Sequence, residues 1–206
     1  VENNSTLKLR DLINYSCMLY KDQNFGFDSK LLQKDLSEFI LERLKNYLKD
    51  KQVRNDIIES STKISNVDEI SKIYKKSIAL NKNIKKDFGQ DVISIYKRSS
   101  KILYSEKENS LEILGSADPG LFKNDFEKNL YKRIHDIRKY FSSIGKTENY
   151  EESLKTLSLA KNEIDAFFEN VIVNDNDPSI KKNRLELLKM LCKSFENYFN
   201  FSKIEA

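Results

Sequence analysis

The acidic stretch from Asp175 to Glu186 is the first place where residue types and spacing could hold a metal ion. Asp175, Asp177 and Glu186 stand at positions 1, 3 and 12 of a calcium-binding loop. Such a loop needs glycine at position 6 for its sharp turn, and this chain has Ile180 there. Pro178 is typical of the first position of a helix, where acidic residues are also favoured. The pattern therefore favours a helix N-terminus over a calcium site.

Side chains suited to catalysis are sparse elsewhere. The sequence has one histidine, His135, which lies within a predicted helix, and no Ser or Cys stands in an obvious pairing with it. Gly-rich phosphate loops and the Cys and His spacing of zinc sites are missing as well. We therefore predict a segment that binds a partner, is itself non-catalytic, and has no cofactor or metal of its own.

Three basic stretches with aromatic or amide side chains nearby are the candidate binding sites. They read LERLKNYLKDKQVRND (41–56), ISIYKRSSKIL (93–103) and SIKKNRLELLK (179–189). Lys and Arg neutralise phosphates, Tyr and Arg stack on unpaired bases, and Asn and Arg bond to base edges. This combination suits an RNA loop. The candidate RNA contacts are Arg43, Lys49, Arg54, Tyr96, Lys97, Arg98, Lys181, Lys182, Asn183 and Arg184.

Each candidate also has a purely structural interpretation. Lys and Arg number 36 together, so any helix of this chain carries a basic, solvated face. Asn183 and Arg184 could hold the acidic turn by hydrogen bonds, and Tyr96 could pack in the core. The remaining alternatives are ion pairs of Arg43 and Arg54 with Asp35, Glu42 or Asp56.

Apolar residues recur every three or four positions along most of the chain, which predicts helices almost throughout. Such stripes cover residues 29–50, 70–80, 126–141 and 180–199. Capping boxes, in which Asn precedes Glu by three residues, stand at Asn66, Asn124 and Asn149. The best strand candidate, residues 171–173, is too short to build a sheet. We predict an all-α fold, a bundle of about seven to nine helices whose last helix begins at Pro178 and exposes Lys181, Lys182 and Arg184 in its first turn.

Length and composition are those of a folded protein. The 206 residues can bury a substantial core in one or two domains. No apolar run is long enough to span a membrane, and the net charge of +4 permits an anionic partner without requiring one. Cys17 and Cys192 stand far apart in apolar helical patterns, as buried thiols in a reducing cytosol do. We therefore expect a cytoplasmic protein without a membrane partner.

Segments rich in turn-forming residues suggest where domain boundaries lie. The chain begins at Val1 without a signal peptide, and we expect it to be a fragment of something longer. Residues 104–123 contain two Gly and a Pro, and could join an N-terminal helical half to a C-terminal one. We predict that residues 1–30 are a helix and linker continuing from an upstream domain, and that residues 31–206 form one binding domain.

Four segments, taken in order, carry a family resemblance. They are LLQKDLSEFILERLKNYLKDKQVRNDIIES (31–60), ISIYKRSSKIL (93–103), GSADPGLFKNDFEKNLY (115–131) and IDAFFENVIVNDNDPSIKKNRLELLKML (164–191). They resemble the beta subunit of the bacterial heterotetrameric glycyl-tRNA synthetase. The last segment is the closest match, with Asp-x-Phe-Phe, Val-x-Val and Asn-Arg-Leu-x-Leu-Leu in the family's order. The resemblance covers residues 31–205, which is nearly the whole chain.

The resemblance has implications for both fold and function. It implies the C-terminal part of that subunit, an all-helical anticodon-binding domain similar to the helical domain of the class I arginyl-tRNA synthetase. It implies that the chain binds glycine tRNA and works with the alpha subunit, which activates glycine, in a heterotetramer. ATP and Mg²⁺ would be cofactors of the complete ligase and not of this segment. The alternative function is a helical interaction module that mediates subunit contact.

Overall fold

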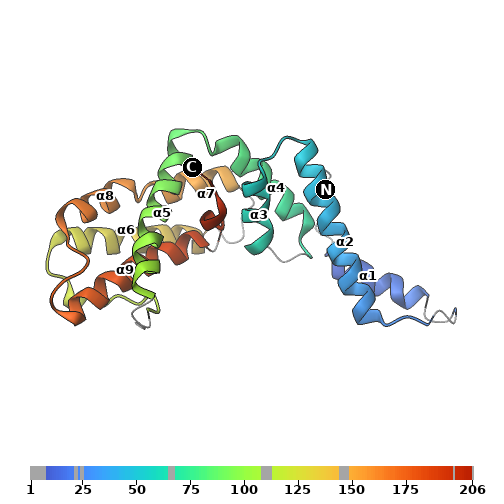
Figure 1. Ribbon diagram of the computed structural model, residues 1–206, viewed down its shortest axis with the longest axis horizontal. Helices are drawn as coiled ribbons and strands as arrows, with labels where there is room; N and C mark the ends of the chain where they lie inside the picture. Colours follow the sequence, from blue (N-terminus) through green and yellow to red (C-terminus); the bar gives the residue numbers. More distant parts are fainter. Residues whose placement is uncertain are drawn as a thin grey trace. The chain divides into compact units, whose positions relative to one another are not determined.

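The computed structural model describes residues 8–20, 23, 26–64, 68–107, 113–143, 149–196 and 198–205. These residues form nine α-helices and short 3-10 turns, and none of them lies in a strand. The prediction of an all-α fold is therefore confirmed. They group into two compact units, Val1–Lys82 and Asn83–Ala206, which are described separately below (Figure 1). In the part of the chain described, no helix is long and apolar enough to cross a membrane.

The first unit is built around one long helix. Its helices are α1 (Leu9–Leu19), α2 (Ser29–Asp50), α3 (Asn55–Ile64) and α4 (Ile70–Asn83), whose last residue belongs to the second unit. Helix α2 begins after Asp28, whose carboxylate accepts a hydrogen bond from Lys30 N at 2.8 Å. Its end is marked by Gln52, which has a positive φ of 60°. This left-handed residue lets Val53 N donate to Leu48 O at 3.0 Å, as is common at helix C-termini.

The apolar stripe predicted along residues 29–50 is buried only in part. Leu44 and Leu48 lie in the core of the first unit, but Leu31 and Phe39 are 57% and 56% exposed. Helices α1 and α3 both pack against α2, yet the first half of its stripe is only partly buried. Periodicity thus predicted the helix correctly but overestimated how much of it this chain covers.

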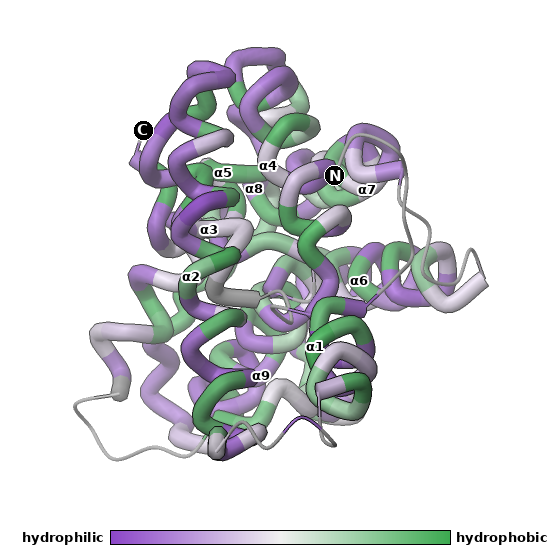
Figure 2. The backbone as a smooth tube through the Cα atoms, turned by 90° about the vertical axis from the view of Figure 1, so that its right-hand side faces the viewer, coloured by the Kyte–Doolittle hydropathy of each residue, from purple (hydrophilic) through white to green (hydrophobic). Residues whose placement is uncertain are grey.

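Other large apolar side chains of the first unit are exposed as well. Figure 2 shows green, hydrophobic stretches recurring along α1 and α2. The exposed residues are Leu12, Tyr15, Met18, Leu19, Tyr20, Phe27, Leu31 and Phe39. We call this set the α1–α2 apolar surface. An apolar surface of this kind commonly marks a site of contact with another protein surface.

The second unit packs its helices around α9. Its elements are α5 (Asp87–Lys107), α6 (Asp125–Ser143), α7 (Tyr150–Ser158), α8 (Lys161–Asn170) and α9 (Pro178–Glu196), with 3-10 turns at Pro119–Leu121 and Phe201–Lys203. Helix α9 packs against α5 and α6, α5 also contacts α7 and α8, and α6 contacts α8 (Figure 1). An aromatic cluster of Tyr96, Phe195, Phe199 and Phe201 closes the core, with neighbouring ring centroids 5.5 to 6.3 Å apart. Burying each Phe contributes roughly 1.5–3 kcal/mol of hydrophobic stabilisation.

The predicted helix caps of the second unit are present. Asn124 and Glu127 form the full capping box: Glu127 N donates to the Asn124 side chain, and Asn124 N donates to the Glu127 carboxylate, both at 3.1 Å. Asn149 Oδ1 accepts from Glu152 N at 3.1 Å at the start of α7. The third predicted box, at Asn66, lies outside the described residues.

Two details of the chain's organisation differ from the sequence-based expectations. The segment 104–123 does not separate two halves, because α5 runs to Lys107 and packs against α9 within the second unit. The boundary between the two units falls instead between residues 82 and 83 of the chain. Cys192 is buried as expected, whereas Cys17 is partly exposed. The division into residues 1–30 and 31–206 remains a prediction.

Candidate functional site

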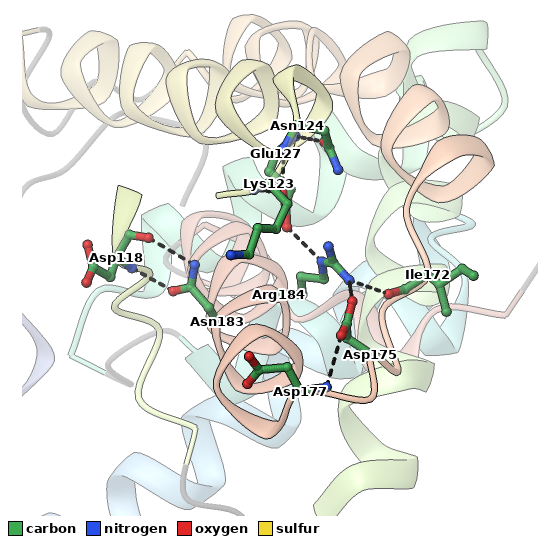
Figure 3. Close-up of polar contacts among 9 residues, drawn as sticks. All are labelled: Asp118, Lys123, Asn124, Glu127, Ile172, Asp175, Asp177, Asn183 and Arg184. Carbon is green, nitrogen blue, oxygen red and sulfur yellow. Dashed lines mark hydrogen bonds and ion pairs between the residues drawn. The ribbon is translucent and has the colours of Figure 1, made fainter. Parts of the chain in front are cut away.

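The N-terminal end of α9 is organised around a buried arginine. Arg184 is 5% exposed. Its Nε donates to Glu127 Oε1 at 2.7 Å, and its Nη1 donates to Ile172 O at 2.8 Å and to Asp175 Oδ2 at 2.6 Å (Figure 3). The guanidinium therefore joins the start of α6 to the loop that precedes α9. We call Arg184, Glu127, Asp175 and Asn183 the α9 hub.

Glu127 balances the charge of Arg184 and is itself fully satisfied. Its side chain is completely buried. One carboxylate oxygen accepts from Arg184, and the other accepts from Lys123 N at 2.6 Å and Asn124 N at 3.1 Å. A buried ion pair is stable only when its remaining hydrogen-bonding groups are also bonded, and this pair meets that condition.

A second set of α9 side chains binds the backbone of residues 114–118. Asn183 accepts from Asp118 N at 2.7 Å and donates to Asp118 O at 2.9 Å (Figure 3). Glu186 accepts from the backbone N–H groups of residues 114, 115 and 116. Met190 Sδ accepts from Ala117 N at 3.3 Å. Because 183, 186 and 190 share one face of the helix, α9 holds this loop along two turns.

The acidic residues before α9 act in this structural arrangement. The pKa of Asp175 is lowered, first by the N–H of Asp177 and then by Arg184. The pKa of Asp177 is also lowered, because its carboxylate accepts from the hydroxyl and N–H of Ser179 at the helix N-terminus. Asp177 and Pro178 thus begin α9 as predicted. Among the described residues, no group of three or more His, Cys, Asp or Glu side chains is placed to hold a metal ion.

These contacts favour the structural interpretation of Asn183 and Arg184. Both residues are at most 5% exposed, and their side chains are bonded within the chain. The expectation that the first turn of α9 exposes Arg184 is therefore corrected. Helix α9 is covered on most sides at this level, so a residue predicted to lie on its outer face is buried instead. We do not retain Asn183 or Arg184 as proposed RNA contacts.

The neighbouring Lys181 and Lys182 differ in exposure and in ion pairing. Lys181 is 26% exposed at its side chain and pairs with Glu106 of α5 at 2.7 Å, whereas Lys182 is exposed. A lysine held by a buried carboxylate contributes little net positive charge to a surface. Lys182 is thus the better placed of the two to meet an anion.

Tyr96 packs in the core, which was the structural alternative to an RNA contact. It is 3% exposed, its hydroxyl and Glu196 Oε1 are 3.0 Å apart, and burial together with Glu196 raises its pKa. It also lines a small, partly enclosed pocket of about 90 Å³. The other lining residues are Ser100, Leu103, Tyr104, Ile113, Lys189, Cys192 and Glu196. Burial raises the pKa of the Cys192 thiol to about 12, so this thiol is not a nucleophile at neutral pH.

The outward face of α5 carries the best exposed cluster of the second unit. Lys101 follows Lys97 by four residues and Arg98 by three, so it neighbours both on the helix surface; Arg98 and Lys101 are exposed and Lys97 is partly exposed. The Arg98 guanidinium lies over the ring of Phe168 from α8, 4.3 Å from its centroid, and 3.6 Å from Asp165. We call Lys97, Arg98, Lys101 and Phe168 the α5 basic face. Two lysines for phosphates and a stacked arginine plane for a base are what single-stranded RNA requires.

The remaining candidates belong to the first unit. Arg54 forms an ion pair with Asp56 at 2.5 Å, as the structural interpretation of this residue predicts. Arg43 is exposed and lies 5.2 Å from the ring centroid of Phe39, and Lys49 is exposed. Arg43 and Lys49 therefore remain proposed contacts on a unit described by itself.

The sequence analysis missed the role of Phe168 in the α5 basic face. Phe167 is fully buried, whereas its neighbour Phe168 is only partly buried. The sequence gives no signal for the stacking of Arg98, because the two residues lie on separate helices.

Comparisons with known proteins agree with this architecture. A family model described as "DALR anticodon binding domain" matches residues 92–206, which lie wholly within the second unit. The chain is 34% identical over 208 residues to the glycine--tRNA ligase beta subunit of Rickettsia canadensis (strain McKiel), covering 99% of this chain and 29% of that protein. It is 33% identical over 207 residues to the subunit of the same name from Rickettsia africae (strain ESF-5), covering 99% and 28%. The chain thus spans less than a third of the length of these relatives.

Proposed function

The chain belongs to the family of DALR anticodon binding domains, and we propose that it binds glycine tRNA as part of the beta subunit of a glycine–tRNA ligase. The observation that carries this proposal is the family match over residues 92–206. The names of the relatives support the choice of glycine as the amino acid. In this proposal the second unit holds the anticodon arm and is non-catalytic.

The α5 basic face is the surface we propose for the RNA. Lys97 and Lys101 would meet backbone phosphates, and Arg98 would stack on or hydrogen-bond an unpaired base. The Arg98–Phe168 stack supports this role, because it orients the guanidinium plane at low cost in side-chain entropy. Lys182 of α9 and Arg43 and Lys49 of the first unit are further proposed phosphate contacts.

The rest of the ligase is assigned by resemblance. We propose that a partner alpha subunit activates glycine with ATP and Mg²⁺ in a cytoplasmic heterotetramer. Holding the anticodon arm would orient the acceptor end of the tRNA towards that partner's active site. Glycylation would then depend on this chain for the choice of tRNA and not for the chemical step.

The test is a titration of the 206-residue chain with glycine tRNA and with the same tRNA carrying an altered anticodon, at two salt concentrations. We expect preference for the glycine anticodon and an affinity that falls as salt rises. Lys97→Ala and Arg98→Ala should each weaken binding, whereas Lys139→Ala, an exposed lysine of α6, should not. Equal binding of both tRNAs would reduce the proposal to general tRNA docking, and no binding would overturn it.

A second function is favoured for the first unit by the α1–α2 apolar surface. We propose that this surface contacts another part of the same ligase. Met18 is 70% exposed and Leu31 is 57% exposed, so Met18→Lys and Leu31→Lys should leave the chain folded. They should weaken association with the alpha subunit or with the rest of the beta subunit, measured by sedimentation. The control is Leu159→Lys, at a 56% exposed position of the second unit, which should associate normally.

A further inference from the structure

A polar groove lies between α6 and α9, apart from the residues assigned so far. Helices α6 and α9 pack side by side (Figure 1). The groove has a volume of about 680 Å³ and opens to solvent. Its lining residues are Arg138, Phe141, Ser142, Lys193, Ser194 and Tyr198. Two of the six are cations, and none is an acid.

Arg138 is held in this groove by neutral atoms alone. Its Nε donates to Ser194 Oγ at 3.0 Å, and its Nη2 donates to Met190 O at 2.8 Å. A guanidinium has five N–H donors, so these two bonds leave donors that can bind a further acceptor. Among the described residues, no carboxylate forms an ion pair with Arg138, and burial lowers its pKa. Its charge is therefore partly desolvated and uncompensated.

Lys193 adds a second cation with the same property. Its Nζ donates to the backbone oxygen of Leu114, which fixes the side chain without neutralising it. Within the described part of the chain, Lys193 also has no carboxylate partner, although Lys189 one turn earlier pairs with Glu196 at 3.7 Å. The groove thus holds two positioned cations whose charges are not balanced.

The hydroxyl groups of the groove are bonded within the chain, and its rings form one wall. Ser194 Oγ donates to Met190 O at 3.0 Å and accepts from Arg138, and Ser142 Oγ donates to Arg138 O at 2.9 Å, so Arg138 and Lys193 are the donors left for an anion. The Tyr198 ring packs on Phe141 with centroids 4.0 Å apart, which fixes one wall. Arginine and lysine N–H groups are common donors to phosphate oxygens.

We propose that this groove binds a phosphate group of the RNA backbone. The inference rests on the proposed function, which supplies RNA as the partner. It adds a phosphate contact made by Arg138 and Lys193, neither of which lies in the α5 basic face.

The experiment measures RNA affinity against salt concentration for the whole chain and three variants, Lys193→Gln, Arg138→Gln and Lys132→Gln. Each lost phosphate contact should reduce the slope of log K against log salt by about 0.7, which corresponds to about fivefold weaker binding near 0.1 M salt. We expect this change in Lys193→Gln and Arg138→Gln. Lys132 is an exposed lysine of α6 outside the groove. Lys132→Gln removes the same charge and should leave the slope unchanged.

Lys193→Gln keeps the test decisive if Arg138→Gln is poorly folded, because Lys193 is exposed. Unchanged slopes in a chain that still binds RNA would overturn the groove and leave the proposed function standing. An equal loss in Lys132→Gln would overturn it too, as a general charge effect. A chain that binds no RNA would overturn both.

Inorganic phosphate distinguishes the source of the anion. At constant ionic strength, added phosphate should compete with RNA more strongly in the wild-type chain than in Lys193→Gln. One outcome would indicate a free-phosphate site and overturn the RNA assignment. In it, phosphate raises the melting temperature only when Lys193 is present, while the salt dependence of RNA binding is the same with and without Lys193.

Discussion

Two arginines lie at opposite ends of α9, Arg184 on the helix itself and Arg138 on the neighbouring α6, and they differ in how their charge is balanced. Arg184, at the N-terminal end, meets Glu127 and Asp175 and is almost completely buried. Arg138, near the C-terminal end, is half-buried, and in the part of the chain described it bonds to a hydroxyl and a backbone carbonyl. The first arrangement is closed within the chain, whereas the second leaves positive charge for a partner. Charge balance therefore separates a structural arginine from a candidate binding arginine when both are largely covered.

Replacing Arg184 should have the largest effect. Arg184→Met leaves Glu127 buried without its partner, and we expect a loss of about 3–5 kcal/mol in the free energy of unfolding, measured with urea. Arg184→Met combined with Glu127→Gln should recover part of that loss, because it removes the unpaired charge. A loss below about 1 kcal/mol in the single variant would contradict the role assigned to the α9 hub.

Glu186 tests whether neutral partners can balance a buried charge. It is 6% exposed, and its bonding partners among the described residues are the N–H groups of residues 114–116. Glu186→Ala should cost about 1.5–3 kcal/mol of unfolding free energy, since it leaves those donors without an acceptor. Glu169→Ala, at an exposed position of α8, should change stability by less than about 0.5 kcal/mol. Equal stability of the two variants would show that the loop does not depend on Glu186.

Arg138→Met sharpens the contrast with Arg184→Met. We expect the unfolding free energy to change by less than about 1 kcal/mol. The two lost hydrogen bonds to neutral atoms are offset by removing a desolvated charge. Urea unfolding at the same pH makes the comparison direct. A loss as large as that of Arg184→Met would mean that Arg138 is a structural residue and would weaken the case for the groove.

The smallest expected effect appears only in acid. The folded chain lowers the pKa of Asp175, so the folded state binds its proton less readily than the unfolded state does. The stability this provides is present above the ordinary pKa of 3.8 and is lost as the pH falls through the lower, folded value. Asp175→Asn should therefore flatten the dependence of unfolding free energy on pH below about pH 4. An unchanged acid profile would exclude Asp175 as a contributor.

Local features of the fold were predictable from the sequence. The capping box at Asn124 and the start of α9 at Pro178 depend on residues within a few positions of each other, so spacing reveals them. The helices followed from apolar periodicity for the same reason. Periodicity could not reveal that the described residues cover the first half of α2 only in part, because burial depends on which other elements lie nearby.

The polar sites could be predicted only in part. Lys97 and Arg98 were found because a short run of basic residues is visible in the sequence itself. Arg184 was placed on the surface because its partner Glu127 lies 57 residues away. Arg138 gave no signal at all, since its significance lies in the missing carboxylate beside it, which only tertiary packing shows.

The contacts between α9 and residues 114–118 determine when this loop can fold during synthesis of the chain. Asp118 bonds to Asn183, 65 residues later, and Gly115 bonds to Glu186, 71 residues later. A ribosome releases residues 114–118 well before it releases their partners, so until α9 emerges the amides of this loop remain bonded to water. Closing such a long connection is a slow step, and the second unit reaches its final form only when its last helix docks.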